Sequence, residues 1–262
     1  MVEPVVSPII LRRTIQQVAD DLPEKIEIPQ ALEMDAESAQ AYEGIRTAAA
    51  SQMGRGAGLG VLQTLRMFCT HPWLTGHFTN VADPANCSVK IRRLFEIMEE
   101  VVASNGKALI FTSFSESVDL IHEELATRFG IFCSTIDGRV AIPMRQKRVD
   151  EFSAYDGPGA LVMNPKAAGV GLNITAANHV IHYNLEWNPA VEDQASARAH
   201  RRGQTKVVTV HRLFYAHTVE EVMDDRMQTK RQIADAAIVG TSGWDQEMSD
   251  LLRALRVSPI VT

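Results

Sequence analysis

Between residues 108 and 214 the sequence alternates short apolar runs with longer stretches of helical composition, and this alternation constrains the possible folds most strongly. The apolar runs cover Ala108–Thr112, Ile131–Ile136, Ala160–Met163, His179–Tyr183 and Val207–Phe214. Parallel strands that are covered on both faces have continuous apolar runs of this kind, and the connections between them are right-handed crossovers. The sequence therefore predicts an α/β fold, a doubly wound parallel sheet with helices on both faces.

Helices are predicted between these strands and on either side of them. An apolar stripe from Ile91 to Val102 has helical spacing, with Ser88 as its expected N-cap and Asn105-Gly106 as its end. Further helices are expected at Ser115–Phe129, Pro143–Phe152, Thr218–Ile238 and residues 243–256.

The first 87 residues lack the strand–helix alternation. Residues 8–50 have helical composition interrupted by Pro23 and Pro29, which predicts two helices and an extended stretch, Ile26–Pro29. A short helix is expected at residues 61–70, and the glycine-rich residues 54–60 are interpreted as a flexible turn before it. We therefore expect a helical connector (1–87), the α/β lobe (88–216) and a C-terminal helical extension (217–262).

Residues 193–204 form the segment with the most distinctive chemistry. Asn188 and Pro189 fit the N-cap and first position of a helix, and Gly203 fits its end. In such a helix the three residues at i, i+4 and i+7 that share one face are Gln194, Arg198 and Arg201. Two guanidinium groups and an amide on one ridge suit a polyphosphate, although arginines in a last helical turn are also common as solvated charges.

Composition limits the alternatives. The formal net charge of −6 argues against a surface coated for nucleic acid, but basic residues gather in the second half of the chain, where they could form a local track. No apolar run is long enough for a membrane span, and no signal pattern begins the sequence, so a cytoplasmic location is expected. The three cysteines fit a reducing compartment. Cys69, His71 and His77 lack a second ligand pair, so no metal site is predicted.

Ordered motifs along residues 9–239 resemble those of the C-terminal helicase lobe of Swi/Snf-type DNA translocases, a branch of helicase superfamily two. The matching strings are QASARAHRRGQ (194–204, motif VI), KALIFTSF (107–114, motif IV), MNPKAAGVGLNITAAN (163–178, motif V) and WNP (187–189). The D-G-x6-R-x6-F spacing of the family occurs at Asp137, Gly138, Arg145 and Phe152. ILRRT (10–14), LPEKIE (22–27) and LRMFCTHPWL (65–74) resemble the segment that joins the two motor lobes, and TVEE (218–221) resembles the start of the C-terminal helix. Several motifs in the correct order are far more specific than any one of them.

The resemblance implies half of a motor. The sequence has no G-x-x-x-x-G-K-[ST] phosphate loop and no D-E-x-H box, so it corresponds to the second RecA-like lobe. ATP and the ligands of its Mg²⁺ would then be held by an N-terminal RecA-like lobe of the same protein, and this chain alone should not hydrolyse ATP. If the source is bacterial, the intact protein would associate with the nucleoid.

Roles at the nucleotide are carried over from the family motifs. The resemblance implies that Arg201 first and Arg198 second stabilise the reacting phosphates, with Gln194 between them and the nucleotide. Gly169 and Gly171 of motif V would pack near the ribose. Arg202 stands where the family usually has an aliphatic residue, and we expect it to face solvent or DNA.

The resemblance also implies a track for double-stranded DNA. The family positions that line this track, where hydroxyls and backbone amides would give a sequence-independent grip, are occupied by Thr112, Ser113, Asp137, Gly138 and Arg145. Asn164 and Lys166 could also bind backbone phosphates. Pro165 departs from the family's S-T-[KR]-A-G-G pattern and removes one backbone donor and one hydroxyl. For Trp187 packing at the helix start is favoured over ligand contact, and His179, His182 and His200 are expected to be structural.

Two other functions remain open. The chain could be a non-catalytic nucleic-acid-binding or protein-interaction module that keeps the helicase fold, which the net acidity and altered motif V favour. It could also be the equivalent lobe of an RNA-directed helicase, although W-N-P and the connector strings favour the DNA branch. The sequence does not identify the process served, the oligomeric state or further protein partners.

Overall fold

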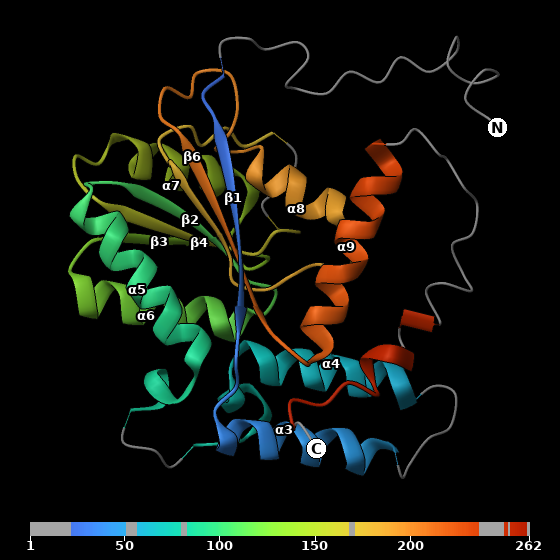
Figure 1. The fold of residues 1–262 in the computed structure, drawn as a ribbon. Coiled ribbons are helices and arrows are strands. Elements are labelled where there is room, and N and C mark those ends of the chain that lie inside the picture. Colours follow the sequence, from blue (N-terminus) through green and yellow to red (C-terminus); the bar gives the residue numbers. More distant parts are fainter. Residues whose placement is uncertain are drawn as a thin grey trace, which may run out of the picture.

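The computed structural model describes residues 22–50, 57–79, 83–167, 171–235, 249–250 and 252–260. Its centre is a six-stranded sheet with the order β1-β6-β5-β2-β4-β3, in which every neighbouring pair is parallel (Figure 1). The strands are β1 (Lys25–Leu32), β2 (Lys107–Phe111), β3 (Phe132–Ile136), β4 (Gly159–Met163), β5 (His179–His182) and β6 (Val208–Tyr215). None of the described helices is long and apolar enough to cross a membrane.

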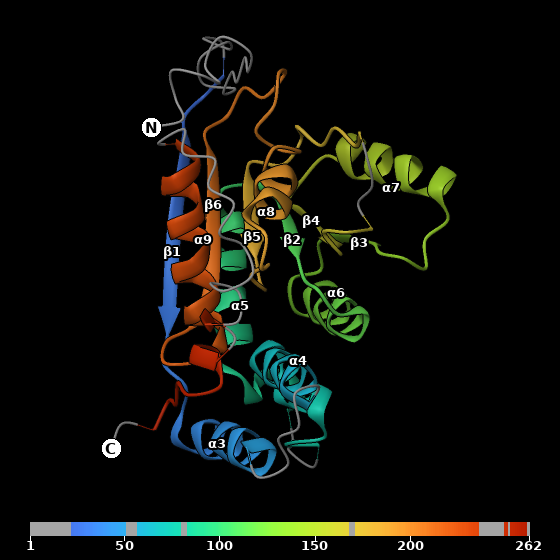
Figure 2. The same ribbon diagram turned by 90° about the vertical axis from the view of Figure 1, so that its right-hand side faces the viewer.

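Helices cover both faces of the sheet (Figure 2). They are α3 (Ala36–Ala50), α4 (Ala57–Thr70), α5 (Val89–Ala103), α6 (Ser115–Phe129), α7 (Ile142–Ala154), α8 (Pro189–Ser196) and α9 (Val219–Asp235), with short 3-10 turns at Pro72–Thr75 and Pro84–Cys87. Within β2, Ala108 and Ile110 belong to the core that α5 and α6 close, whereas Leu109 and Phe111 belong to the core of α7 and α8. Because side chains alternate across a strand, the continuous apolar runs serve both cores. The predicted doubly wound α/β fold is confirmed.

The predicted elements agree with the structure to within a few residues for the five runs between residues 107 and 215. All five residues of β2 and all five of β4 are buried. Helix α5 begins after Ser88 and ends before Asn105, whose φ of 50° lies in the left-handed region that ends helices. Predicted helical residues 8–20, 236–238, 243–248 and 251 lie outside the described part of the chain.

Strand β1 is the main addition to the prediction. The sequence indicated only an extended stretch at Ile26–Pro29, whereas residues Lys25–Leu32 pair in parallel with the whole of β6. Pro29 cannot donate a ladder hydrogen bond, and it is tolerated because β1 is an edge strand. Part of the expected connector is therefore built into the sheet of the lobe.

Helices α3, α4 and α9 share a third core beyond the ends of β5 and β6. Tyr42, Leu65 and Phe68 pack there with Val222 and Met223, so the segments before and after the α/β lobe bury one another. Gly58 and Gly60, interpreted from the sequence as part of a flexible turn, lie in the first turns of α4. Packing of the apolar face of α4 against this core explains the helix despite its glycines.

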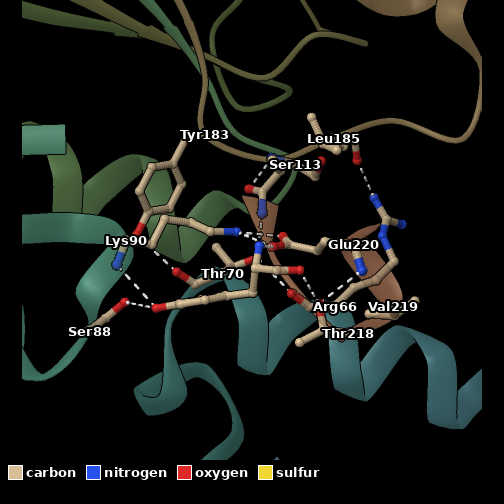
Figure 3. A network of polar contacts seen from close by, with 12 residues as sticks. Arg66, Thr70, Ser88, Lys90, Ser113, Tyr183, Leu185, Thr218, Val219 and Glu220 are labelled. Carbon is tan, nitrogen blue, oxygen red and sulfur yellow. Dashed lines mark hydrogen bonds and ion pairs between the residues drawn. The ribbon is translucent and has the colours of Figure 1, made fainter. Parts of the chain in front are cut away.

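A buried ion pair fixes where α5 and α9 begin (Figure 3). Lys90 Nζ lies 2.5 Å from Glu220 Oε2, and Glu220 also accepts the backbone N–H of Tyr215 at 3.0 Å. The Tyr215 hydroxyl lies 3.1 Å from Ser88 Oγ and accepts the backbone N–H of Lys90 at 3.1 Å. Burial raises the pKa of Tyr215, so this hydroxyl stays neutral. The charges satisfy each other where water is excluded, and the ends of β6, α5 and α9 are thereby held together.

Candidate functional site

Four loops meet at the carboxyl edge of the sheet, where ligands of open parallel sheets gather. Strands β5, β2, β4 and β3 are neighbours in that order, so the residues after them are brought side by side. These loops contain Asn184–Trp187, Thr112–Phe114, Asn164–Ala167 and Asp137–Val140. We call them the edge loops.

Asn184 joins the edge loops to helix α4. Its Oδ1 accepts hydrogen bonds from Thr112 Oγ1 at 2.7 Å and from the backbone N–H of Ser113 at 3.2 Å. Its Nδ2 donates to Thr70 Oγ1 at 2.7 Å, and the Tyr183 hydroxyl donates to the Thr70 carbonyl at 2.9 Å. One buried amide therefore holds the loop after β2, the loop after β5 and the end of α4.

This network engages the Thr112 side chain inside the protein. Its side chain is 0% exposed, and its hydroxyl bonds Asn184 and lies 2.5 Å from Ser117 Oγ. The expected place of Thr112 along a DNA track stays a prediction. Thr112 shapes the loop that presents Ser113, whose side chain is half-buried.

The Asp137 side chain also forms its hydrogen bonds inside the protein. Its carboxylate is buried and accepts the backbone N–H of Arg139 at 2.9 Å and Arg139 Nε at 2.7 Å. Burial alone would raise the pKa of Asp137, but the Arg139 hydrogen bonds and charge hold it below its usual value. The carboxylate therefore fixes the turn at residues 137–139, and the expected place of Asp137 along a DNA track stays a prediction. Gly138 is exposed, and the space on the side where a Cβ would stand is open to 4 Å.

Arg145 and Asn164 connect the loops to one another. Arg145 Nε donates to the Val140 carbonyl at 2.9 Å, and Arg145 Nη1 donates to the Ala167 carbonyl. Asn164 Nδ2 donates to the Ser113 carbonyl at 2.9 Å, and Asn164 Oδ1 accepts the backbone N–H of the residue two positions later at 3.0 Å. That residue, Lys166, is exposed, so its ammonium group is available to a ligand.

The arginine-bearing segment differs from its predicted form. Asn188 caps α8 by accepting the Ala190 N–H at 3.1 Å, as predicted, but α8 ends at Ser196 and not near Gly203. The Arg198 carbonyl accepts the N–H of Ile174 at 3.0 Å, and Gln204 Nε2 donates to three carbonyls in this region. These tertiary hydrogen bonds replace helical ones, so Arg198 and Arg201 lie in successive turns.

The two predicted phosphate-binding arginines differ in exposure. Arg198 is 9% exposed, whereas Arg201 and Gln194 are exposed. Burial and then the nearby charge of Arg201 lower the pKa of Arg198. Within the described part of the chain, no hydrogen bond or ion pair engages the Arg201 side chain. Arg202 is exposed as expected.

Motif V is described only in part. Gly171 is exposed and has a φ of 99°, a conformation that favours glycine. Gly169 lies outside the described residues. Its expected role at the ribose stays a prediction.

Buried charges anchor helix α8. Glu192 Oε1 accepts the backbone N–H of Glu186 at 2.9 Å, and Glu192 Oε2 lies 3.3 Å from Arg212 Nε and 3.7 Å from Arg231 Nη2. Burial, opposed by these arginines, raises the pKa of Glu192 to about 7. Arg212 also pairs with Asp224 of α9, so the ion pairs connect α8, β6 and α9.

Three residues of this region were not among the sequence-predicted site residues. They are Asn184, Glu186 and Glu192, and the only local signal for them was their position beside the W-N-P string. Their partners lie elsewhere in the sequence, so the pattern around them could not indicate their roles.

The remaining aromatic and histidine candidates pack within the protein. Trp187 lies against the third core, and its ring centroid is 5.4 Å from the Arg226 guanidinium carbon. His182 Nε2 lies 2.8 Å from Ser196 Oγ, and His200 Nε2 lies 2.8 Å from the Pro23 carbonyl oxygen. His179 stacks on the ring of His211. Among the described residues, no group of three or more His, Cys, Asp or Glu side chains could hold a metal ion.

Comparison with known proteins gives consistent matches. Residues 89–203 match the model of the helicase conserved C-terminal domain. The chain is 35% identical over 253 residues to the putative ATP-dependent helicase/translocase YwqA of Bacillus subtilis, covering 93% of this chain and 27% of that protein. It is 32% identical to the Zorya protein ZorD of Escherichia coli, covering 92% of this chain and 24% of that protein. The chain thus spans about a quarter of the length of these curated relatives.

Solved structures give the same assignment. The Sulfolobus solfataricus SWI2/SNF2 ATPase core in complex with dsDNA matches with a TM-score of 0.70 and 29% identity, over 98% of this chain and 56% of that one. The C-terminal domain of the same ATPase matches with a TM-score of 0.68 and 27% identity, over 90% of this chain and 100% of that domain.

Proposed function

The chain belongs to the Swi/Snf-type branch of the helicase C-terminal domains, and on this basis we propose that it is the second motor lobe of an ATP-dependent double-stranded DNA translocase. The proposal includes an N-terminal RecA-like lobe of the same protein as the partner that holds ATP and Mg²⁺. The chain's match to the full length of a SWI2/SNF2 C-terminal domain supports this division between two lobes.

The observation that carries the proposal is the exposed Arg201 beside the buried Arg198. During phosphoryl transfer, negative charge spreads over the oxygens of the transferred group, and an arginine from a second body stabilises it. Arg201 has a side chain free to cross a cleft, and Arg198 adds a second positive charge beside it. Gln194, also exposed, could hydrogen-bond to the same ligand.

On the DNA side, the edge loops would present a sequence-independent grip. The Ser113 hydroxyl, the exposed backbone at Gly138 and the Lys166 ammonium group are suited to phosphate oxygens. The residues that would support these groups by fixing the loops are Thr112, Asp137, Arg145 and Asn164. Phosphate contacts of this kind favour duplex binding without base preference.

A non-catalytic binding module is the second candidate. Pro165 lacks the backbone donor expected in motif V, and much of the polar surface of the edge loops is used internally. Such a module would bind DNA through Ser113 and Lys166 and would not need Arg201. The two candidates therefore differ in what they predict for Arg201→Ala. The motor would lose ATP turnover, whereas the binding module would keep its DNA binding.

The test is ATP turnover by the intact protein with and without duplex DNA, compared with its Arg201→Ala variant. We expect DNA to stimulate the wild type and Arg201→Ala to lower turnover by about a thousandfold, because this group would stabilise the transition state from across the cleft. Arg202→Ala is the matched control, since it removes the same charge one residue away. At saturating duplex, where any lost DNA contact of Arg202 no longer limits binding, it should retain most of the turnover.

Two results would contradict the proposal. If the intact protein binds DNA but shows no stimulated turnover, the motor assignment fails and the binding module takes its place. If turnover is stimulated but Arg201→Ala and Arg202→Ala behave alike, the role given to Arg201 is wrong.

A further inference from the structure

Glu186 is a buried carboxylate that the nucleotide and DNA roles above do not use. Its side chain belongs to the loop after β5, is 6% exposed, and accepts a hydrogen bond from Ser113 Oγ at 2.8 Å. No Lys, Arg or His side chain of the described residues forms an ion pair with it. Burying a carboxylate without a cation is unfavourable, so its presence at a candidate DNA-binding loop points to a functional role.

The backbone of Glu186 is attached to a second structure. Its N–H donates to Glu192 Oε1 at 2.9 Å, in the first turn of α8. Glu192 is held in turn by Arg212 and Arg231, and Gln194 follows two residues later. Glu186 thus contacts the loop of Ser113 through its side chain and the helix preceding the arginines through its backbone.

Competition for one proton makes this junction sensitive to a ligand. A serine hydroxyl has a single hydrogen to donate. In the structure Ser113 donates it to Glu186, and a DNA phosphate at Ser113 would have to take that hydrogen for itself. The phosphate would also repel the carboxylate left behind, because both carry negative charge close together in a poorly solvated site.

We propose that Glu186 is a positioning residue that senses a DNA phosphate at Ser113 and transmits its presence to α8, the helix preceding Arg198 and Arg201. The inference rests on the proposed motor function. Without DNA, Glu186 holds Ser113 and α8 in the arrangement of the structure. With DNA, the carboxylate loses its hydrogen bond, and the loop that carries it shifts the anchor of α8. A ligand shifts an equilibrium between two conformations only if it contacts them differently, and a DNA phosphate at Ser113 would do so.

The test uses Glu186→Gln in the intact protein, with two measurements on each variant: duplex affinity at low salt and the ratio of DNA-stimulated to DNA-free ATP turnover. A neutral amide accepts a weaker hydrogen bond and does not repel phosphate, so duplex affinity should rise about fivefold. The stimulation ratio should fall by a similar factor. Glu100→Gln is the matched control, because it makes the same charge change on an exposed residue near the end of α5, at the opposite edge of the sheet.

A second variant, Ser113→Ala, removes the hydroxyl for which the two acceptors compete. In that background only the repulsion between Glu186 and the phosphate remains, so Glu186→Gln should change affinity less than in the wild type, and the double-mutant cycle isolates the coupling between the two residues. A stability defect alone would lower turnover with and without DNA and would leave the ratio and this coupling unchanged.

The outcomes separate the two proposals. A wild-type protein whose turnover does not respond to DNA would overturn the motor function itself. A responsive wild type, with Glu186→Gln equal to Glu100→Gln in both affinity and stimulation ratio, would overturn only the role of Glu186. Additive effects of Glu186→Gln and Ser113→Ala on affinity would overturn it as well.

Discussion

The edge loops and the segment from Gln194 to Gln204 are both identified by family motifs, yet they differ in which predicted site residues are exposed. In the edge loops, Thr112 and Asp137 are buried and direct their hydrogen-bonding groups to partners inside the protein. In the arginine-bearing segment, Gln194 and Arg201 are exposed. A motif therefore marks both the residues that shape a site and those that reach a ligand, and only the contacts distinguish them.

The difference also concerns stability. Buried polar groups that lose a partner incur a desolvation penalty, whereas exposed groups exchange a protein contact for water. Substitutions in the edge loops should therefore change the free energy of unfolding. Substitutions at exposed positions of the arginine-bearing segment should change activity while leaving that free energy nearly unaltered.

Asn184→Ala should destabilise the fold more than any other substitution considered for this comparison. It removes the partner of Thr112 Oγ1, Ser113 N–H and Thr70 Oγ1, which are linked across three segments. We expect the free energy of unfolding to fall by about 3 kcal/mol, measured by urea denaturation. A loss no greater than that of a surface Asn→Ala substitution would contradict the structural role given to the edge loops.

A pH-dependent effect of intermediate size is expected from His182, which stacks on Phe111 and lies 2.8 Å from Ser196 Oγ of α8. Burial lowers the pKa of its imidazole to about 3 in the folded protein, against about 6.5 when exposed. Its contribution to stability is therefore complete above pH 6.5 and is lost as the pH falls through that value. Between pH 6.5 and 5 the free energy of unfolding should fall by about 2 kcal/mol. The slope of this decrease should approach about 1.4 kcal/mol per pH unit.

The measurement is the free energy of unfolding against pH for the wild type and His182→Gln. Subtraction of the two profiles removes other titrating groups, including Glu192, whose pKa burial raises to about 7. Parallel profiles for the wild type and His182→Gln would show that His182 does not stay neutral in the fold.

A smaller loss of stability is expected from Asn188→Ala at the start of α8. Loss of the cap to the Ala190 N–H should lower the free energy of unfolding by about 1 kcal/mol, and Asn188→Ser should restore most of it. Because Asn188 lies close to Asn184 in the sequence and receives the same substitution, the pair compares an exposed helix cap with a buried amide of the edge loops. Equal losses at both positions, measured by urea denaturation, would remove the distinction between buried and exposed polar groups.

The fold could be predicted to a large extent because its signals are local. Apolar runs, their spacing and the residues that end helices predict β2 to β6 and α5 to α9, and those elements are present. Asn188 and Pro189 predicted the start of α8 correctly for the same reason. The end of α8 at Ser196 could not be predicted, because the hydrogen bond between the Arg198 carbonyl and Ile174 joins segments that are separate in the sequence.

The amino-acid sequence alone thus specified the order of strands and helices along the chain and the α/β class. Other features emerged only from the folded chain: residues Lys25–Leu32 form an edge strand, Thr112 is buried, and Ser113 donates to Glu186. These features depend on partners that are far apart along the chain. Ser113 and Glu186 are separated by 73 positions and Thr70 and Asn184 by 114, so their hydrogen bonds exist only after the sheet has assembled.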